Sequence, residues 1–153
     1  MSDLPHIARR RIEAELIGRL YNEMCAAIDQ PTALKILTSS IESAAFAEGR
    51  RFAAQADGPP SLAHFRTVLA AWGGALQMEL LEETDDLLRF NVVRCDYIST
   101  YEDLALPPEL VSLLSCRRDA PFARGYSDHL EFTREGTLAE GRACCDFCYR
   151  WRE

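Results

Sequence analysis

The feature that most constrains the fold is a change in the spacing of apolar residues at Asp85-Asp86. Before this pair, apolar side chains recur every three or four residues, a spacing typical of amphipathic helices. After it, Leu88, Phe90 and Val92 occupy every second position, which predicts a half-buried strand over residues 88–95. The sequence therefore predicts helices in the first half of the chain and a sheet in the second half.

Three amphipathic helices are predicted before this change. The first covers residues 6–28, the second begins near Pro31, and the third begins after Ser61, a suitable N-cap, with residues 79–83 as its acidic extension. The apolar stripe of the first helix is predicted to face the core and consists of Ile12, Leu16, Leu20, Tyr21, Met24 and Ile28. Cys25 falls on the same stripe and is interpreted as a small core residue.

The second half alternates between short helices and strands. A helical turn is predicted at 99–102, a helix from Pro107-Pro108 to Cys116, a loop over 120–128, and antiparallel strands over 130–134 and 142–151. The predicted fold class is α+β, with three N-terminal helices packed on a small antiparallel β-sheet and a helical insertion after the first strand. A chain of 153 residues that is 48% hydrophobic predicts a single domain over residues 1–153.

Charge and hydropathy narrow the class of partner. The net charge of -7 argues against nucleic acid, since phosphate binding needs clustered basic side chains. No apolar run is long enough to span a bilayer, and the N-terminus has no apolar segment typical of a signal peptide, so a cytoplasmic protein that does not bind membranes is predicted. In that compartment the six cysteines are expected to be free or bound to metal rather than bridged.

Reactive side chains gather between positions 95 and 149. Strand parity places Cys95 on the same face as Arg89 and Asn91. In the last strand, Cys145 and Asp146 are predicted to point to opposite faces, so both cannot line one pocket without a bulge. For every one of these residues, a role in packing or at the surface is the alternative.

Several short motifs in this region resemble the L-2-amino-thiazoline-4-carboxylic acid hydrolase family. They are, in order, Asn91-Val-Val-Arg-Cys95, Cys116-Arg-Arg-Asp119, Phe132-Thr-Arg134 followed by Thr137-Leu138, and Gly141 followed by Cys145-Asp146-Phe147. The resemblance covers about the last 70 residues. It implies a hydrolase that opens the thiazoline ring of a small-molecule substrate to give N-carbamoyl-L-cysteine. No cofactor is predicted, with zinc left as a possibility.

The chemistry of such a reaction assigns roles to the matching residues. The ring carbon lies between sulfur and two nitrogens, and its protonated form is a planar cation that carboxylates such as Asp119 and Asp146 can hold. Attack comes either from a thiolate of Cys95, Cys116 or Cys145 or from an activated water. His129 is a candidate proton shuttle.

Two substrate-binding residues complete the predicted set. Arg134 is a candidate to hold the carboxylate of the substrate, and the resemblance makes Asn91 a further candidate. A homodimer is also predicted as plausible, because alanine-rich helices allow close packing between small domains.

A second, non-enzymatic hypothesis uses the same thiols. Cys145-Asp-Phe-Cys148 has C-x-x-C spacing, and Cys95 with Cys116 would complete four sulfur ligands for a structural zinc. The protein would then be a small-molecule-binding or scaffold domain, similar to vinyl-4-reductase-type sensor domains. The sequence supports a thioredoxin-like redox role less than a zinc site, because the C-x-x-C motif lies within a predicted strand instead of at the start of a helix.

Overall fold

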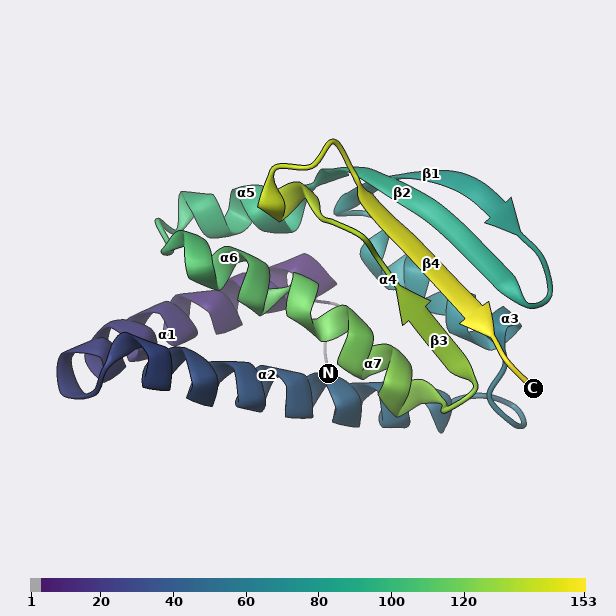
Figure 1. Ribbon diagram of the computed structural model, residues 1–153, viewed down its shortest axis with the longest axis horizontal. Helices are drawn as coiled ribbons and strands as arrows, with labels where there is room; N and C mark the ends of the chain where they lie inside the picture. Colours follow the sequence, from purple (N-terminus) through teal and green to yellow (C-terminus); the bar gives the residue numbers. More distant parts are fainter. Residues whose placement is uncertain (1–3) are drawn as a thin grey trace.

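Two long N-terminal helices form a hairpin in the computed structural model, which describes residues 4–153 (Figure 1). Helix α1 spans His6–Ala27 and α2 spans Gln30–Ala53. Asp29 separates them and caps α2, because its carboxylate accepts a hydrogen bond of 3.0 Å from the backbone N–H of Thr32. Both predicted helices are thus confirmed.

The other elements are shorter. They follow in chain order as α3 (Leu62–Phe65), η1 (Arg66–Val68), α4 (Leu69–Trp72), β1 (Leu76–Glu83), β2 (Leu87–Cys95), α5 (Asp96–Asp103), α6 (Pro108–Leu114), η2 (Cys116–Arg118), α7 (Asp119–Tyr126), β3 (Leu130–Thr133), η3 (Leu138–Glu140) and β4 (Cys145–Trp151), where η marks a 3-10 helix. The strands form one antiparallel sheet in the order β1-β2-β4-β3. The α+β fold class is confirmed.

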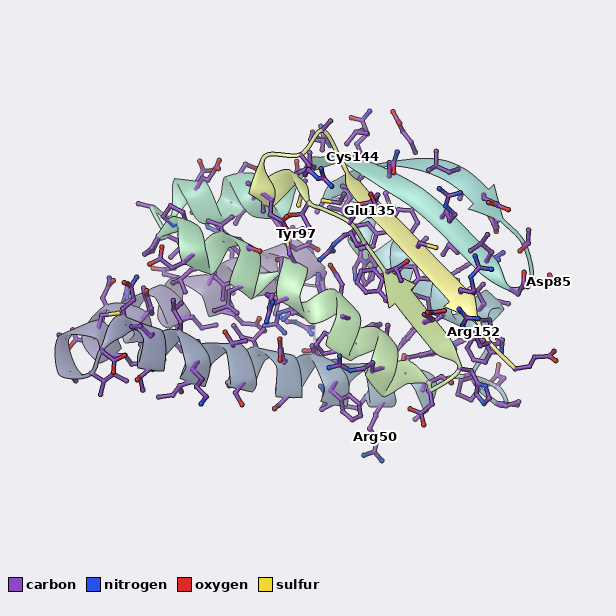
Figure 2. All side chains as sticks on the ribbon, viewed as in Figure 1. Arg50, Asp85, Tyr97, Glu135, Cys144 and Arg152 are labelled. Carbon is purple, nitrogen blue, oxygen red and sulfur yellow. The ribbon has the colours of Figure 1, made fainter. Side chains whose placement is uncertain are left out.

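The core has two parts. In one, Leu62, Phe65 and Val68 pack on the sheet face that carries Phe90 and Tyr149. In the other, apolar side chains of α1 and α2 pack against α5 and α6. Figure 2 shows Tyr97 among the helices, whereas charged side chains such as Arg50 lie at the periphery. The two parts meet along a band that becomes the candidate site.

Two predicted elements are wrong. Residues 76–83 form strand β1 and not the end of a helix, because the helical segment ends at Trp72 before Gly73-Gly74 and the chain then pairs with β2. Residues 119–126 form helix α7 instead of a loop. Pro121 is compatible with helix there because it lies in the first turn, where its missing N–H costs nothing.

The orientation of α1 also differs from the prediction. Ala14 and Gly18 face the core, whereas Ile12, Leu16 and Leu20 are exposed. Small side chains allow close approach, as at Gly18, where a Cβ would lie 2.6 Å from the side chain of Leu106. Cys25 is likewise exposed, so its interpretation as a core residue is wrong.

Helices α2 and α7 cross at two glycines, where no side chain fits. A Cβ built on Gly125 would lie 2.1 Å from the carbonyl oxygen of Phe46. We therefore expect Gly125→Ala to lower the free energy of unfolding by about 1–3 kcal/mol or more, measured by urea denaturation, because backbone must move to admit the methyl group. Gly74→Ala is the control, since a Cβ there meets nothing within 4 Å. Equal stability of the two variants would contradict the close crossing.

Candidate active site

A cavity of about 430 Å³ lies where the two parts of the core meet. It is bounded by the start of α1, the end of α2, the α4 region, the central strands, and the segment from Ser115 to Phe122. This volume is in the range of pockets that enclose small organic ligands. It is therefore the candidate site.

Five of the eight residues singled out from the sequence line this cavity. They are Cys95, Cys116, Asp119, Arg134 and Cys145. They come from β2, η2, the first position of α7, the end of β3 and the start of β4. Segments that are distant in the chain thus bring three thiols, one carboxylate and one guanidinium together.

Cys95 reaches the cavity because of a β-bulge. In the pairing of β1 with β2, Gln77 lies opposite Arg94 and Met78 lies opposite Val92, so Val93 is skipped. One extra residue reverses the alternation of side chains beyond it. Cys95 consequently lines the cavity beside Val92, and the predicted common face with Arg89 and Asn91 is wrong.

Asp119 and Arg134 form an ion pair at the cavity wall. Nη1 of Arg134 lies 2.5 Å from Oδ2 of Asp119, and the two side chains are 13% and 17% exposed. The other terminal nitrogen of Arg134 donates to the carbonyl oxygen of Cys116 at 3.0 Å. The guanidinium also lies over the rings of Phe132 and Phe147, at 5.3 and 5.1 Å from their centroids. Arg134 is thereby fixed, and it orients Asp119.

The environment of Asp119 brings its pKa close to neutrality. Burial raises the pKa of this carboxyl to about 6, against the opposing effect of Arg134. A carboxyl with such a pKa can accept and return a proton near physiological pH. Asp119 therefore has the properties of a general acid–base group.

The three cavity thiols are held in their neutral form. Burial raises the pKa of Cys116 to about 12, and the negative charge of Asp119 adds to this shift. Burial also raises the pKa of Cys95 and Cys145, although backbone N–H groups oppose it at both. At Cys145 the donor is Leu138, whose N–H lies 3.1 Å from the sulfur. None of these thiols has the lowered pKa of an activated nucleophile.

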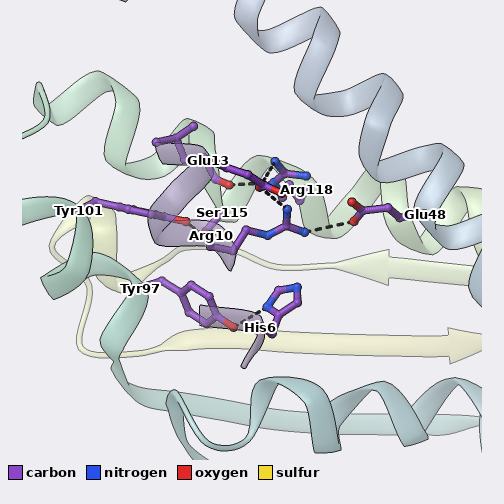
Figure 3. Close-up of polar contacts among 9 residues, drawn as sticks. His6, Arg10, Glu13, Glu48, Tyr97, Tyr101, Ser115 and Arg118 are labelled. Carbon is purple, nitrogen blue, oxygen red and sulfur yellow. Dashed lines mark hydrogen bonds and ion pairs between the residues drawn. The ribbon is translucent and has the colours of Figure 1, made fainter. Parts of the chain in front are cut away.

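A polar cluster that the sequence did not predict forms the opposite wall (Figure 3). Arg10 is 6% exposed and binds Glu13 and Glu48 at 2.6 and 3.1 Å, and these carboxylates raise its pKa although burial opposes them. Arg118 donates from Nε to the carbonyl oxygen of Leu114. Burial, together with the nearby charge of Arg10, lowers the pKa of Arg118. Arg118 also lies 3.6 Å from Glu13, so two arginines share two glutamates at this wall.

His6 and Tyr97 extend the same wall. The Nδ1 atom of His6 lies 2.7 Å from the Tyr97 hydroxyl, and Figure 3 shows the two side chains pointing toward each other. Burial, and to a lesser extent Arg10, lowers the pKa of His6 to about 4. His6 is therefore neutral at pH 7. Sequence patterns do not reveal this wall, because its residues come from α1, α2, α5 and η2 and form no local motif.

Asn91, Asp146 and His129 lie outside the cavity lining. Asp146 accepts hydrogen bonds from the backbone N–H groups of Glu135 and Gly136, which lower its pKa although burial opposes them. Asn91 lies opposite Asp146 in the pairing of β2 with β4. His129 is exposed, stacks on Trp151 and bonds to the carbonyl oxygen of Arg152. Strand parity correctly separates Cys145 from Asp146.

The thiols of residues 4–153 bear on the metal hypothesis. All six cysteines in this range are free thiols. No group of three His, Cys, Asp or Glu side chains in the described part of the chain converges as a metal ion would require. Within the C-x-x-C motif, Cys145 and Cys148 occupy alternate faces of β4.

A family model described as L-2-amino-thiazoline-4-carboxylic acid hydrolase matches residues 9–149 of the 153-residue chain. The chain belongs to this family. The match to the L-2-amino-thiazoline-4-carboxylic acid hydrolase family includes most of α1, all of α2 and the C-terminal motifs, and so contains both walls of the cavity except His6. No curated protein matches the chain. Between residues 4 and 153, every helix is too short or too polar to cross a lipid bilayer.

The accessibility of the thiols gives a first test of the geometry of the candidate site. We expect iodoacetamide at pH 7 to label Cys25 first and Cys116 last, because Cys25 is exposed whereas Cys116 is half-buried in the cavity and has a pKa of about 12. Peptide mass spectrometry over a time course measures the order. Selective early labelling of Cys116 would instead identify an activated thiolate.

Proposed function

We propose that the protein hydrolyses the ring of a small cyclic amidine-like acid in this cavity, with 2-amino-thiazoline-4-carboxylate as the first substrate to test. The observation that carries the proposal is the convergence of Asp119, braced by Arg134, with three neutral thiols and an excess of arginines on one enclosed space. The family to which the chain belongs supports the substrate class.

Charge supports an anionic ligand. Although the chain carries a net charge of -7, five arginines and only two carboxylates line the cavity. The arginines are Arg9, Arg10, Arg51, Arg118 and Arg134, and the carboxylates are Glu48 and Asp119. We assign Arg118 to the carboxylate of the substrate, because Arg134 is paired with Asp119 and Arg10 with two glutamates, whereas Arg118 has a longer contact of 3.6 Å with Glu13, which also binds Arg10. A bound carboxylate would compensate the charge that lowers the pKa of Arg118.

Asp119 is proposed as the acid–base group. Its carboxylate takes a proton from a water as that water adds to the ring carbon between sulfur and nitrogen. The tetrahedral intermediate, formed from the ring with its nitrogen protonated, collapses with cleavage of the carbon–sulfur bond. The proton held by Asp119 passes to the leaving sulfur, and the hydroxyl proton is released to solvent as the carbonyl forms. Water and substrate together supply all atoms of the open-chain carbamoyl thiol. The thiols of Cys95, Cys116 and Cys145 then serve as neutral walls of the cavity, since their raised pKa values oppose nucleophilic attack.

This role gives a defined pH dependence. We expect kcat/KM to rise about tenfold per pH unit below pH 6 and to level off above it, because the base must be ionised and the pKa of Asp119 is about 6. Steady-state kinetics from pH 4.5 to 8 measure the profile, with the substrate titrated separately by absorbance. A rate that is flat across this range would contradict general-base catalysis by Asp119.

Ring opening of the aminothiazoline acid, followed through release of a free thiol, is the experiment that tests the proposed function. The wild type is expected to turn over, and each of Cys95→Ser, Cys116→Ser and Cys145→Ser is expected to retain turnover within about tenfold. Loss of activity in one serine variant that still folds would assign covalent catalysis to that thiol. A wild type without turnover would overturn the proposed substrate.

A further inference from the structure

The outward face of α1 is apolar along most of its length. Ile12, Leu16 and Leu20 follow one another at intervals of four residues and are 62%, 60% and 48% exposed. Residues at this spacing lie on one side of a helix. The core-facing residues of α1, Ala14 and Gly18 among them, lie on the other side. These three large side chains thus form an outer stripe that nothing within residues 4–153 covers.

The outer stripe is symmetric about Leu16. Ile12 precedes Leu16 by the same four residues by which Leu20 follows it. Two further exposed apolar residues, Leu4 and Ile28, flank the helix at twelve residues before and after Leu16. Two copies of α1 packed antiparallel, with a twofold axis at Leu16, would therefore place apolar residue against apolar residue throughout.

The charges beside the outer stripe have the same symmetry with opposite signs. Arg9 and Glu23 are each seven residues from Leu16, and Glu13 and Arg19 are each three residues from it. On a helix of 3.6 residues per turn, all four of these charged residues lie on the same side of α1 as the outer stripe or directly beside it. In the antiparallel pair Arg9 faces Glu23 of the other copy, and Arg19, which pairs with Glu15 of its own helix, faces Glu13, which binds Arg10. A parallel pair would instead oppose like charges.

We infer that the protein forms a homodimer through an antiparallel α1–α1 contact whose twofold axis passes at Leu16. The contact is isologous, as closed dimers require. A 22-residue helix is about 33 Å long, so a single helix pair buries less area than a standard interface, and the dimer is expected to dissociate in the micromolar range. Arg9, which lines the cavity, lies in the contact, so the dimer brings a glutamate of the second copy toward the cavity mouth.

Sedimentation equilibrium between about 1 and 500 μM gives the first test. The wild type is expected to approach twice its chain mass of 17.2 kDa at high concentration. Leu16→Glu is expected to stay monomeric, and its fold should be unaffected because Leu16 is 60% exposed. Ile36→Glu is the control, since Ile36 is 50% exposed on α2 and should leave the dimer intact. A wild type that is monomeric throughout, or dimers of Leu16→Glu, would overturn the inference.

Cross-linking tests the register directly. In a Cys25→Ser background, Leu16→Cys is expected to give a covalent dimer on mild oxidation, because the two sulfur atoms meet at the axis. Ile12→Cys is expected to give none, since the two copies of residue 12 are eight residues apart along the pair, about 12 Å, beyond disulfide reach. Cross-linking at position 12 without position 16 would refute this twofold axis.

Discussion

Asp119→Asn is expected to lower kcat by about 10²–10⁴-fold while the protein remains folded. The amide has nearly the shape of the carboxylate and can still accept a hydrogen bond from Arg134, but it cannot take a proton from water. The variant loses an interaction that is made only in the transition state, the proton transfer from water. For this reason kcat and kcat/KM should fall together. Any activity that remains should no longer show the rise of kcat/KM with pH below about pH 6.

Asp146→Asn is the control for this change. Asp146 is the other aspartate that the sequence made a catalytic candidate, but it binds the turn at Glu135 and Gly136, outside the cavity lining. Its variant is therefore expected to keep kcat within a few fold. The opposite pattern, with an active Asp119→Asn and an inactive Asp146→Asn, would refute the assignment of Asp119.

Arg134→Met is expected to cost about 3–5 kcal/mol of unfolding free energy, because it leaves the carboxylate of Asp119 enclosed without its counter-charge. For a domain of this size the melting temperature should fall by roughly 6–20 °C. The pKa of Asp119 should also rise further, since Arg134 opposes the effect of burial. Calorimetry or urea denaturation measures the stability.

Two variants separate this explanation from a general loss of packing. Arg152→Met breaks the pair with Glu131, which has the same 2.5 Å separation but side chains 64% and 43% exposed, and it should leave the unfolding free energy nearly unchanged because solvent screens the pair. Arg134→Met combined with Asp119→Leu should recover much of the lost stability while remaining inactive, because no unpaired charge is left. A double variant as unstable as Arg134→Met alone would show that the cost does not come from the stranded carboxylate.

Local patterns in the sequence predict some elements well and others poorly. The alternation of Leu88, Phe90 and Val92 predicts β2 correctly, because that strand is central and one of its faces is buried. β1 lies at the sheet edge and is mostly exposed, so it shows no alternation and was predicted as helix. Its strand conformation depends on pairing with β2, which is a tertiary effect.

The residues of the candidate site likewise divide into those that the sequence predicts and those that it does not. Motif order along the chain predicts Cys116, Asp119 and Arg134, and the structure brings them together. Cys95 enters the cavity only through the bulge at Val93, which strict alternation cannot foresee. The outer stripe of α1 was predicted to face the core, because periodicity gives the apolar side of a helix but does not say what covers that side.

The most direct test is a crystal structure of the inactive Asp119→Asn variant soaked with 2-amino-thiazoline-4-carboxylate. The ligand is expected in the cavity, with its carboxylate on Arg118 and its ring nitrogens within hydrogen-bonding distance of residue 119. A cavity without ligand density at saturating substrate, or a ligand bound on the sheet face of Asn91 and Asp146, would contradict it.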